Sequence, residues 1–212
     1  VKHKDLISIN HYSADEVAEI FTLAREMKEA PDRFHDALRG KTLGMIFEKS
    51  STRTRVSFEV GMFQLGGHAL FLSARDIQLG RGETIYDTAR VLSRYLDGIM
   101  ARTFAHKTVT DLAQYASVPV INGLTDLLHP CQGLTDYFTA QEKLGELKGR
   151  KIAWIGDGNN MAHSLMFGGP KVGMNIAVAT PAGYAPDPEI VAKAQADAEI
   201  AGTKILITSS IR

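Results

Sequence analysis

Apolar and polar positions along the chain predict helices and strands in regular alternation. The first clear pattern covers residues 13–30, where apolar side chains recur at helical spacing: Val17, Ile20, Phe21, Ala24 and Met27. Ser13 and Glu16 stand at the spacing of a capping box, in which each side chain bonds the backbone N–H of the other residue. We therefore expect a helix that begins directly after Ser13.

Beyond this helix, short apolar runs alternate with helical patterns. The expected strands cover residues 41–47, 68–73, 97–102 and 118–122. Between them we expect helices over 53–65, 84–96 and 106–116, and a glycine-rich loop at 80–83. Strands that alternate with helices are typical of parallel sheets, so this part of the chain predicts an α/β domain.

A long helical pattern over residues 129–145 leads to the short charged break ELKGR, after which a second series begins. Its expected strands cover 151–156, 175–181 and 203–209, and its helices start near Met161 and cover 188–201. Pro170 predicts that the first of these helices ends or kinks near Gly168 and Gly169, because a proline inside a helix costs about 3 kcal/mol. We expect two parallel-sheet α/β domains, residues 1–145 and 146–212, of which the second has few strands and is incomplete.

The composition of the chain indicates which broad class of protein it belongs to. Of 212 residues, 44% are apolar and 23% are charged, values that are ordinary for soluble globular proteins. Lys plus Arg equals Asp plus Glu at 24 each, so no overall charge favours nucleic acid or an anionic membrane. No apolar run reaches the roughly 18 residues of a membrane span, and the first residues lack a signal-peptide pattern. With its single cysteine, Cys131, the chain is expected to be soluble and cytoplasmic.

The corner between the strand at 41–47 and the helix at 53–65 carries dense anion-binding chemistry, Ser51-Thr52-Arg53-Thr54-Arg55. Backbone amides at a helix N-terminus are unpaired, hydroxyls add donors, and an arginine binds phosphate or carboxylate with two parallel hydrogen bonds. Arg53 and Arg55 lie about 200° apart on a helix, so we expect Arg53 to face the ligand and Arg55 to pair within the protein. The alternative is a simple helix cap with two solvated arginines.

Two later strand ends add further polar groups. Arg102 ends the strand at 97–102, and the loop after the strand at 118–122 supplies His129, Cys131 and Gln132. Ligands of parallel sheets gather at the carboxyl ends of the strands, so Arg102 is expected to converge with Arg53. His129 can donate to a carbonyl oxygen and Gln132 can accept from an amide, although a loop histidine before a proline is often structural. Cys131 has no evident base, which favours an inert, packed thiol.

These motifs together resemble a known family. The segments FEKSSTRTR, MARTF, HPCQ and GDGNN, in this order and spacing, are similar to the transcarbamoylases, and GDGNN with the acid-containing segment QLGRGETIYDTARVLSRY resembles their ornithine-specific members. The resemblance covers essentially the whole chain. It implies a transcarbamoylase-like fold of two parallel-sheet domains.

The resemblance also implies roles for individual residues. The carbamoyl phosphate site would contain Ser51, Thr52, Arg53, Thr54, Gln78, Arg102, His129 and Gln132. Gln78 would be supplied by a neighbouring subunit, which implies a homotrimer or a multiple of trimers. Asn160 and Leu124 would lie at the ornithine site. The catalytic groups would be Arg102, His129 and Thr54, which stabilise the oxyanion of a tetrahedral intermediate.

The implied reaction, a step of arginine biosynthesis, is attack by the δ-amine of L-ornithine on carbamoyl phosphate, giving L-citrulline and phosphate. No metal or organic cofactor is implied. The segment WIGDGNN follows a strand but lacks the G-x-G-x-x-G spacing of dinucleotide-binding domains.

The chain departs from the family in its last part. Two motifs, Asp-x-x-x-Ser-Met-Gly and His-Cys-Leu-Pro, are absent, and they would complete the ornithine site. The C-terminal helix that packs on the first domain would also be missing, which leaves apolar surface uncovered. We expect a fragment or partly ordered portion of a longer enzyme, lacking the C-terminal third, and not a degenerate relative. A transcarbamoylase with another amine acceptor and a non-catalytic carbamoyl phosphate-binding relative stay open as alternatives.

Overall fold

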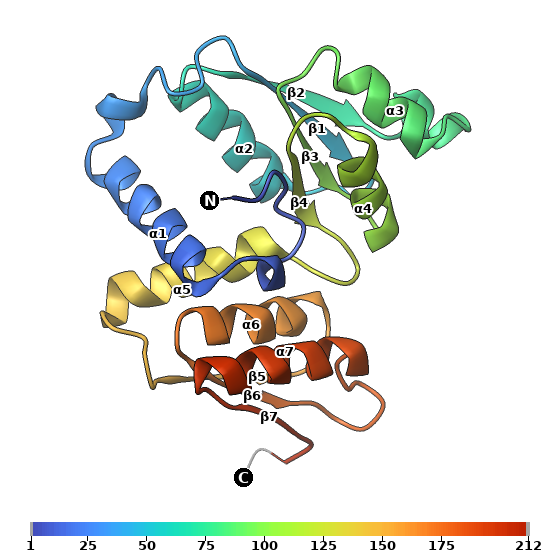
Figure 1. The fold of residues 1–212 in the computed structure, drawn as a ribbon. Helices are drawn as coiled ribbons and strands as arrows, with labels where there is room; N and C mark the ends of the chain where they lie inside the picture. Colours follow the sequence, from blue (N-terminus) through green and yellow to red (C-terminus); the bar gives the residue numbers. More distant parts are fainter. Residues whose placement is uncertain (1, 211–212) are drawn as a thin grey trace. The chain divides into compact units, whose positions relative to one another are not determined.

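The structure is a computed structural model that describes residues 2–210 (Figure 1). Its contacts divide the chain into two compact units, which are described separately. The sheet unit contains residues 2–7 and 22–126, and the C-terminal unit contains 8–21 together with the chain from Leu127 onward. Helix α1, Ala14–Glu29, contributes residues to both units. Its predicted capping box is confirmed, since Glu16 N–H bonds Ser13 Oγ at 3.1 Å and Ser13 N–H bonds Glu16 Oε2 at 3.0 Å.

The sheet unit is built on four parallel strands in the order β2-β1-β3-β4 (Figure 1). The strands are β1 Thr42–Phe47, β2 His68–Ser73, β3 Gly98–Arg102 and β4 Val120–Leu124. The helices between them are α2 Thr52–Gln64, α3 Ile85–Leu92 and α4 His106–Tyr115, with short 3₁₀ turns at Pro31–Phe34 and Gln78–Arg81. The predicted parallel sheet is confirmed.

Side chains of the central strands alternate between two apolar layers, as the period of two requires. Met45 of β1 and Met100 of β3 pack in the layer that contains Phe58 and Met62 of α2. Ile46 and Ile99 pack in the opposite layer, with residues of α3 and α4. The sheet is therefore covered on both faces, which explains the continuous apolar runs in its sequence.

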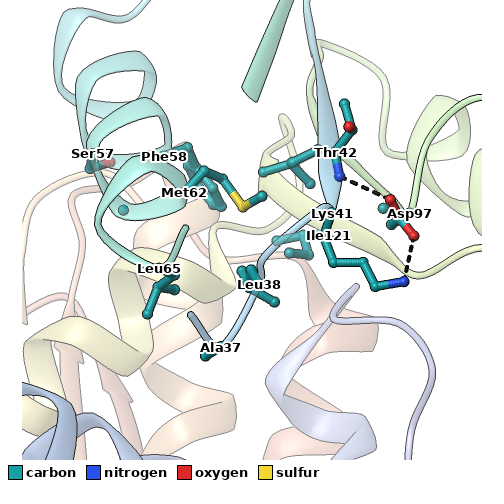
Figure 2. Close-up of a pocket in the computed structure, with 13 residues that line it drawn as sticks. Ala37, Leu38, Lys41, Thr42, Ser57, Phe58, Met62, Leu65, Asp97 and Ile121 are labelled. Carbon is teal, nitrogen blue, oxygen red and sulfur yellow. Dashed lines mark hydrogen bonds and ion pairs between the residues drawn. The ribbon is translucent and has the colours of Figure 1, made fainter. Parts of the chain in front are cut away.

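An open apolar pocket of about 550 Å³ lies beside α2 at the amino ends of β1 and β3 (Figure 2). Leu38, Phe58 and Met62 line it, and the ion pair of Lys41 with Asp97, 2.8 Å long, stands at the strand ends.

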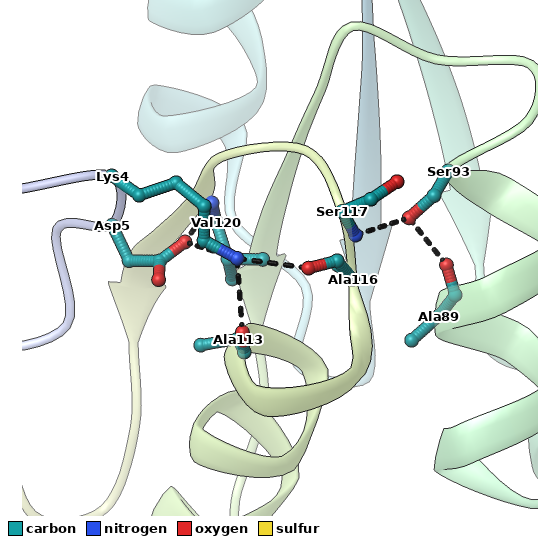
Figure 3. Close-up of polar contacts among 8 residues, drawn as sticks. All are labelled: Lys4, Asp5, Ala89, Ser93, Ala113, Ala116, Ser117 and Val120. Carbon is teal, nitrogen blue, oxygen red and sulfur yellow. Dashed lines mark hydrogen bonds and ion pairs between the residues drawn. The ribbon is translucent and has the colours of Figure 1, made fainter.

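The first residues of the chain extend this sheet, which sequence analysis did not predict. Leu6 lies beside Ile121 of β4, and its N–H bonds the carbonyl of Val120 at 2.9 Å. Lys4 Nζ donates to the carbonyls of Ala113 and Ala116 at the end of α4, at 3.1 and 2.8 Å (Figure 3). A cation at these exposed carbonyls favours the helix C-terminus, so this segment closes the β4 edge and caps α4.

The C-terminal unit contains three parallel strands in the order β5-β6-β7. They are β5 Lys151–Ile155, β6 Asn175–Ala179 and β7 Ile205–Thr208, and the helices are α5 Pro130–Leu144, α6 Asn160–Lys171 and α7 Pro188–Ala201, after a 3₁₀ turn at Ile9–His11. Helices α6 and α7 lie on one face of the sheet (Figure 1). The other face exposes Ile155 and Leu206, so within the described residues this small sheet is covered on one side.

Three sequence predictions differ from the structure. Helix α3 ends at Leu92, four residues earlier than expected, and β4 extends two residues beyond Asn122. The prediction that α6 ends or kinks near Gly168 and Gly169 is wrong about the end of the helix, which continues through Pro170 to Lys171. Every residue from Ala162 to Pro170 is buried, so tertiary packing outweighs the local cost of the proline, which lies in the last turn.

Candidate functional site

The N-terminus of α2 forms the centre of the candidate site. Ser51 caps the helix, since its Oγ accepts from Thr54 N–H at 3.2 Å, as a cap residue should. The Ser51 hydroxyl also donates to Thr54 Oγ1 at 3.1 Å. The amides of Thr52 and Arg53 have no acceptor within the helix, and with the helix dipole they favour an anion at this end. Ser51, Thr52, Arg53 and Thr54 thus lie together at an exposed helix terminus.

Arg102 is brought to this terminus by the sheet. It pairs in register with Phe47, the last residue of β1, and its carbonyl accepts from Glu48 N–H at 2.9 Å. The register between β3 and β4 shifts between Ala101 and Arg102, which lie opposite Asn122 and Leu124, so Gly123 of β4 is the extra residue at this point. Arg102 Nη1 then donates to Thr54 Oγ1 at 3.2 Å. The predicted convergence of these two strand ends is confirmed.

The electrostatics of this corner are unfavourable without an anion. Burial and the charge of nearby Arg53 lower the pKa of Arg102. Arg102 Nε is buried without a hydrogen-bond partner, and among residues 2–210 neither arginine forms an ion pair. Two guanidinium groups that repel each other beside a helix N-terminus would be stabilised by a bound phosphate or carboxylate. The arrangement is therefore that of an anion site and not of a simple cap.

Arg55 points to other partners, as predicted. Its Nε bonds Glu59 Oε1 at 3.0 Å, one helical turn along α2. Its guanidinium also lies 3.8 Å from the ring centroid of Phe71 on β2. Arg55 is thus held by an ion pair and a cation–π contact, whereas Arg53 forms neither with the residues that the structure describes.

Two other predicted residues of the sheet unit occupy different places. Leu124 is the buried last residue of β4 and lies opposite Arg102 in the register. Gln78 is exposed at the start of the 3₁₀ turn Gln78–Arg81, and in the described part of the chain no hydrogen bond joins it to Arg53 or Arg102. Its predicted role requires a neighbouring subunit and stays a prediction.

The remaining predicted residues belong to the C-terminal unit. His129 is the cap residue of α5, and its backbone N–H donates to Ser164 Oγ at 2.8 Å. Gln132 is exposed on the first turn of α5, where its Nε2 donates to Asp136 at 2.8 Å. Asn160 begins α6, directly after Asn159, whose side chain caps that helix. The predicted boundary between residues 145 and 146 also stays a prediction.

Cys131 is expected to be chemically inert. Burial raises the pKa of its thiol to about 12. A raised thiol pKa means that the neutral form is favoured in the fold, so the thiolate is scarce at neutral pH and becomes abundant only as the pH approaches 12.

We therefore predict that iodoacetamide at pH 8 leaves Cys131 unmodified in the folded protein and modifies it completely in guanidinium chloride. Mass spectrometry of the intact protein measures the extent of Cys131 modification under both conditions. Rapid alkylation of the folded protein at pH 8 would contradict this prediction.

The pocket in Figure 2 is not the candidate site, although it is large and apolar. It lies at the amino ends of the strands, whereas ligands of parallel sheets bind at the carboxyl ends, where Arg102 stands. Its charged groups, Lys41 and Asp97, already neutralise each other.

Sequence analysis missed two polar residues of α6, His163 and Ser164. Both are buried and form hydrogen bonds with the loop that carries His129. A signal was available in the sequence, because a histidine and a serine within a buried helix need hydrogen-bond partners.

Among the described residues, no helix has the length and apolarity of a membrane span, and no three His, Cys, Asp or Glu side chains gather as metal ligands would.

Comparison with known proteins places these features in a family. Residues 4–142 match the aspartate/ornithine carbamoyltransferase carbamoyl-P binding domain, and residues 148–212 match the Asp/Orn binding domain of the same family. The ornithine carbamoyltransferase of Thermococcus kodakarensis is 57% identical over 201 residues, covering 94% of this chain and 64% of the relative. The ornithine carbamoyltransferase of Anoxybacillus flavithermus is 57% identical over 211 residues, which cover 99% of this chain and 67% of the relative.

A solved structure agrees with this assignment. The ornithine carbamoyltransferase from Pyrococcus furiosus superposes with a TM-score of 0.92 at 55% sequence identity, covering 96% of this chain and 66% of that one. The chain spans about two thirds of the length of these relatives. By both its family matches and its relatives, the chain belongs to the ornithine carbamoyltransferase branch of the aspartate/ornithine carbamoyltransferase family.

Proposed function

We propose that the protein transfers the carbamoyl group of carbamoyl phosphate to the δ-amine of L-ornithine, giving L-citrulline and phosphate. The observation that carries the proposal is the pair Arg53 and Arg102, which converge at the α2 N-terminus and have no carboxylate partner within residues 2–210. Its relatives are ornithine carbamoyltransferases, which supports this donor and this acceptor.

In the proposed donor site, the phosphate of carbamoyl phosphate binds the α2 N-terminus. The amides of Thr52 and Arg53, the hydroxyl of Thr52 and the Arg53 guanidinium donate hydrogen bonds to the phosphate, and Ser51 holds Thr54 in place through its own hydroxyl. Thr54 Oγ1 already accepts from Ser51 and Arg102, so its own O–H is available for a ligand oxygen. Arg102 reaches both the phosphate and the carbamoyl oxygen.

The proposed reaction needs no covalent enzyme intermediate. The neutral δ-amine attacks the carbamoyl carbon, and the carbonyl electron pair moves to the oxygen. Arg102, Thr54 and His129 stabilise this oxyanion, and Gln132 accepts from the carbamoyl NH₂. The intermediate then expels phosphate, which Arg53 and the helix N-terminus stabilise, and the departing phosphate takes up the proton that the attacking nitrogen loses. Asn160 and Leu124 contact ornithine, and the protein's contribution is positioning and electrostatics.

We also propose a homotrimer, or a multiple of trimers, in which Gln78 of one subunit completes the donor site of the next. The sheet unit supports an interface because β2 is a partly exposed edge strand, with Leu70 and Phe71 exposed, and α2 exposes Val56 and Val60 nearby. A role in arginine biosynthesis and a cytoplasmic location are part of the same proposal.

Two alternatives share the donor site: a transcarbamoylase for aspartate, putrescine or another amine, and a non-catalytic carbamoyl phosphate-binding relative. We expect the complete gene product that contains residues 1–212 to carbamoylate ornithine in preference to these other amines in steady-state assays. Carbamoylation of aspartate but not ornithine would contradict the acceptor. Calorimetry that shows carbamoyl phosphate binding without any citrulline formation would favour the non-catalytic alternative.

A further inference from the structure

One buried hydroxyl connects the two residues of the C-terminal unit that the proposed function places at different substrates. Ser164 Oγ accepts from the backbone N–H of His129 at 2.8 Å and donates to the backbone carbonyl of Asn160 at 2.8 Å. Ser164 is only 1% exposed, so water does not compete for these bonds. The start of α6 and the start of α5 are thereby joined through a single side chain.

The neighbouring His163 holds the same loop at a second point. Its Nδ1 lies 2.9 Å from the carbonyl of Leu127, and its Nε2 lies 3.0 Å from the backbone nitrogen of Asp187. A carbonyl only accepts and an N–H only donates, so the ring is neutral with its proton on Nδ1. Leu128, between the two anchored positions, is buried. Both backbone groups that flank this residue are therefore fixed by α6.

The fit between the helices is close around these bonds. A Cβ added to Gly133 of α5 would stand 3.2 Å from Ser164 Cβ and 3.0 Å from Ile9 Cδ1, so a larger residue at position 133 would push these neighbours aside by a few tenths of an ångström. His129 itself has the non-helical angles φ −137° and ψ 70°, precedes Pro130, and accepts from Gly133 N–H at 3.1 Å. With both its N–H and its carbonyl bonded, the backbone fixes the direction from which the imidazole leaves.

We propose that Ser164 and His163 are positioning residues that act on catalysis through His129, with Ser164 setting the place of His129 relative to Asn160. This inference rests on the proposed function, in which His129 contacts the carbamoyl oxygen. A group that stabilises a transition state must be held to within a fraction of an ångström, so a small shift of the loop lowers the rate without unfolding the protein.

The test compares two variants of the complete gene product that remove one hydroxyl each from the α5–α6 contact. Ser164→Ala is expected to lower kcat about tenfold. Tyr137→Phe is the matched control, because the Tyr137 hydroxyl also joins these helices, donating to the carbonyl of Leu165 at 2.6 Å, but contacts neither His129 nor Asn160. We expect Tyr137→Phe to lower the unfolding temperature at least as much and to keep kcat within about twofold. Equal losses of kcat in both variants would overturn the inference, because they would show a general packing effect.

A double-mutant cycle separates positioning from an independent structural role. If Ser164 acts through His129, Ser164→Ala should cost about tenfold in the wild-type background and less than about twofold when His129 is already alanine. A full tenfold loss in both backgrounds would overturn the inference while leaving the proposed function intact. A wild-type protein that forms no citrulline would instead refute the proposed function.

Conservative variants of His163 test the second anchor. Asparagine places a donor where Nδ1 stands, and glutamine places an acceptor where Nε2 stands. We expect His163→Asn to recover most of the kcat that His163→Gln loses, since only asparagine keeps the bond to Leu127. The opposite order would assign the role of His163 to the Asp187 loop and overturn its part in the inference.

Discussion

Replacing Arg53 with alanine is expected to abolish saturation by carbamoyl phosphate at accessible concentrations. Each charge-assisted hydrogen bond contributes about 1.5–3 kcal/mol, so the loss of a two-bond contact raises the half-saturating concentration by roughly 100-fold or more. The fold should be retained, because Arg53 is exposed and forms no ion pair among the described residues. Its removal also relieves the repulsion that helps to lower the pKa of Arg102. Steady-state kinetics with varied carbamoyl phosphate measure the effect.

The matched control is Arg55→Ala, two positions along the same helix. It removes an equal charge together with the ion pair to Glu59 and the contact with Phe71, but no proposed ligand contact. We expect this variant to lower thermal stability and to keep the carbamoyl phosphate dependence. If the Arg53→Ala variant binds carbamoyl phosphate as well as the wild type does, the phosphate site has been placed wrongly.

Replacing Arg102 with methionine is expected to reduce kcat/KM by roughly 10²–10³, the usual loss when one oxyanion donor is removed. The stability of the ligand-free protein should move in the opposite direction. Arg102 is half-buried, its Nε lacks a partner, and Arg53 repels it, so an apolar side chain of similar length removes an uncompensated charge. We therefore expect an unchanged or higher unfolding temperature without ligand, and a much smaller rise on adding carbamoyl phosphate.

Lys41→Met is the control for this prediction, because Lys41 stands at the opposite edge of the same sheet and has a carboxylate partner. Its hydrogen bond to Asp97 is the main cause of the lowered pKa of that carboxyl. Removing Lys41 should lower stability slightly and leave kcat/KM unchanged. A loss of stability in Arg102→Met as large as its loss of activity would contradict the account, since it would show Arg102 to be structural.

The corner between β1 and α2, which carries Ser51 to Arg55, was predicted well because local sequence patterns specify it. Nearby residues alone predict the strand, the serine that caps the helix, and the place of Arg53 as the second helical residue. The convergence of Arg102 with this corner followed from a general rule about parallel sheets. The separate role of Arg55 followed from helical geometry, and the ion pair with Glu59 agrees with it.

Features that depend on contacts between distant residues were not predicted. The segment around Leu6 pairs with β4 through backbone bonds that leave no pattern in six residues. The effect of Pro170 on the helix was misjudged because the local free-energy cost of a proline was considered without the burial of α6. His163 and Ser164 were overlooked because their partners, Leu127, His129 and Asp187, lie more than twenty positions away along the chain. In each of these cases the local structure depends on contacts between residues that are distant in the sequence, and hydrophobic periodicity does not report such contacts.

The central claim is that the carbamoyl group moves from phosphate to the δ-nitrogen of ornithine. It is tested most directly by incubating the complete gene product with carbon-13 carbamoyl phosphate and L-ornithine and analysing the products by mass spectrometry and phosphate release. We predict that the label appears in the ureido carbon of citrulline, with one phosphate released for each citrulline formed. Label recovered only as hydrolysis products, or on an acceptor other than ornithine, would contradict the proposed function.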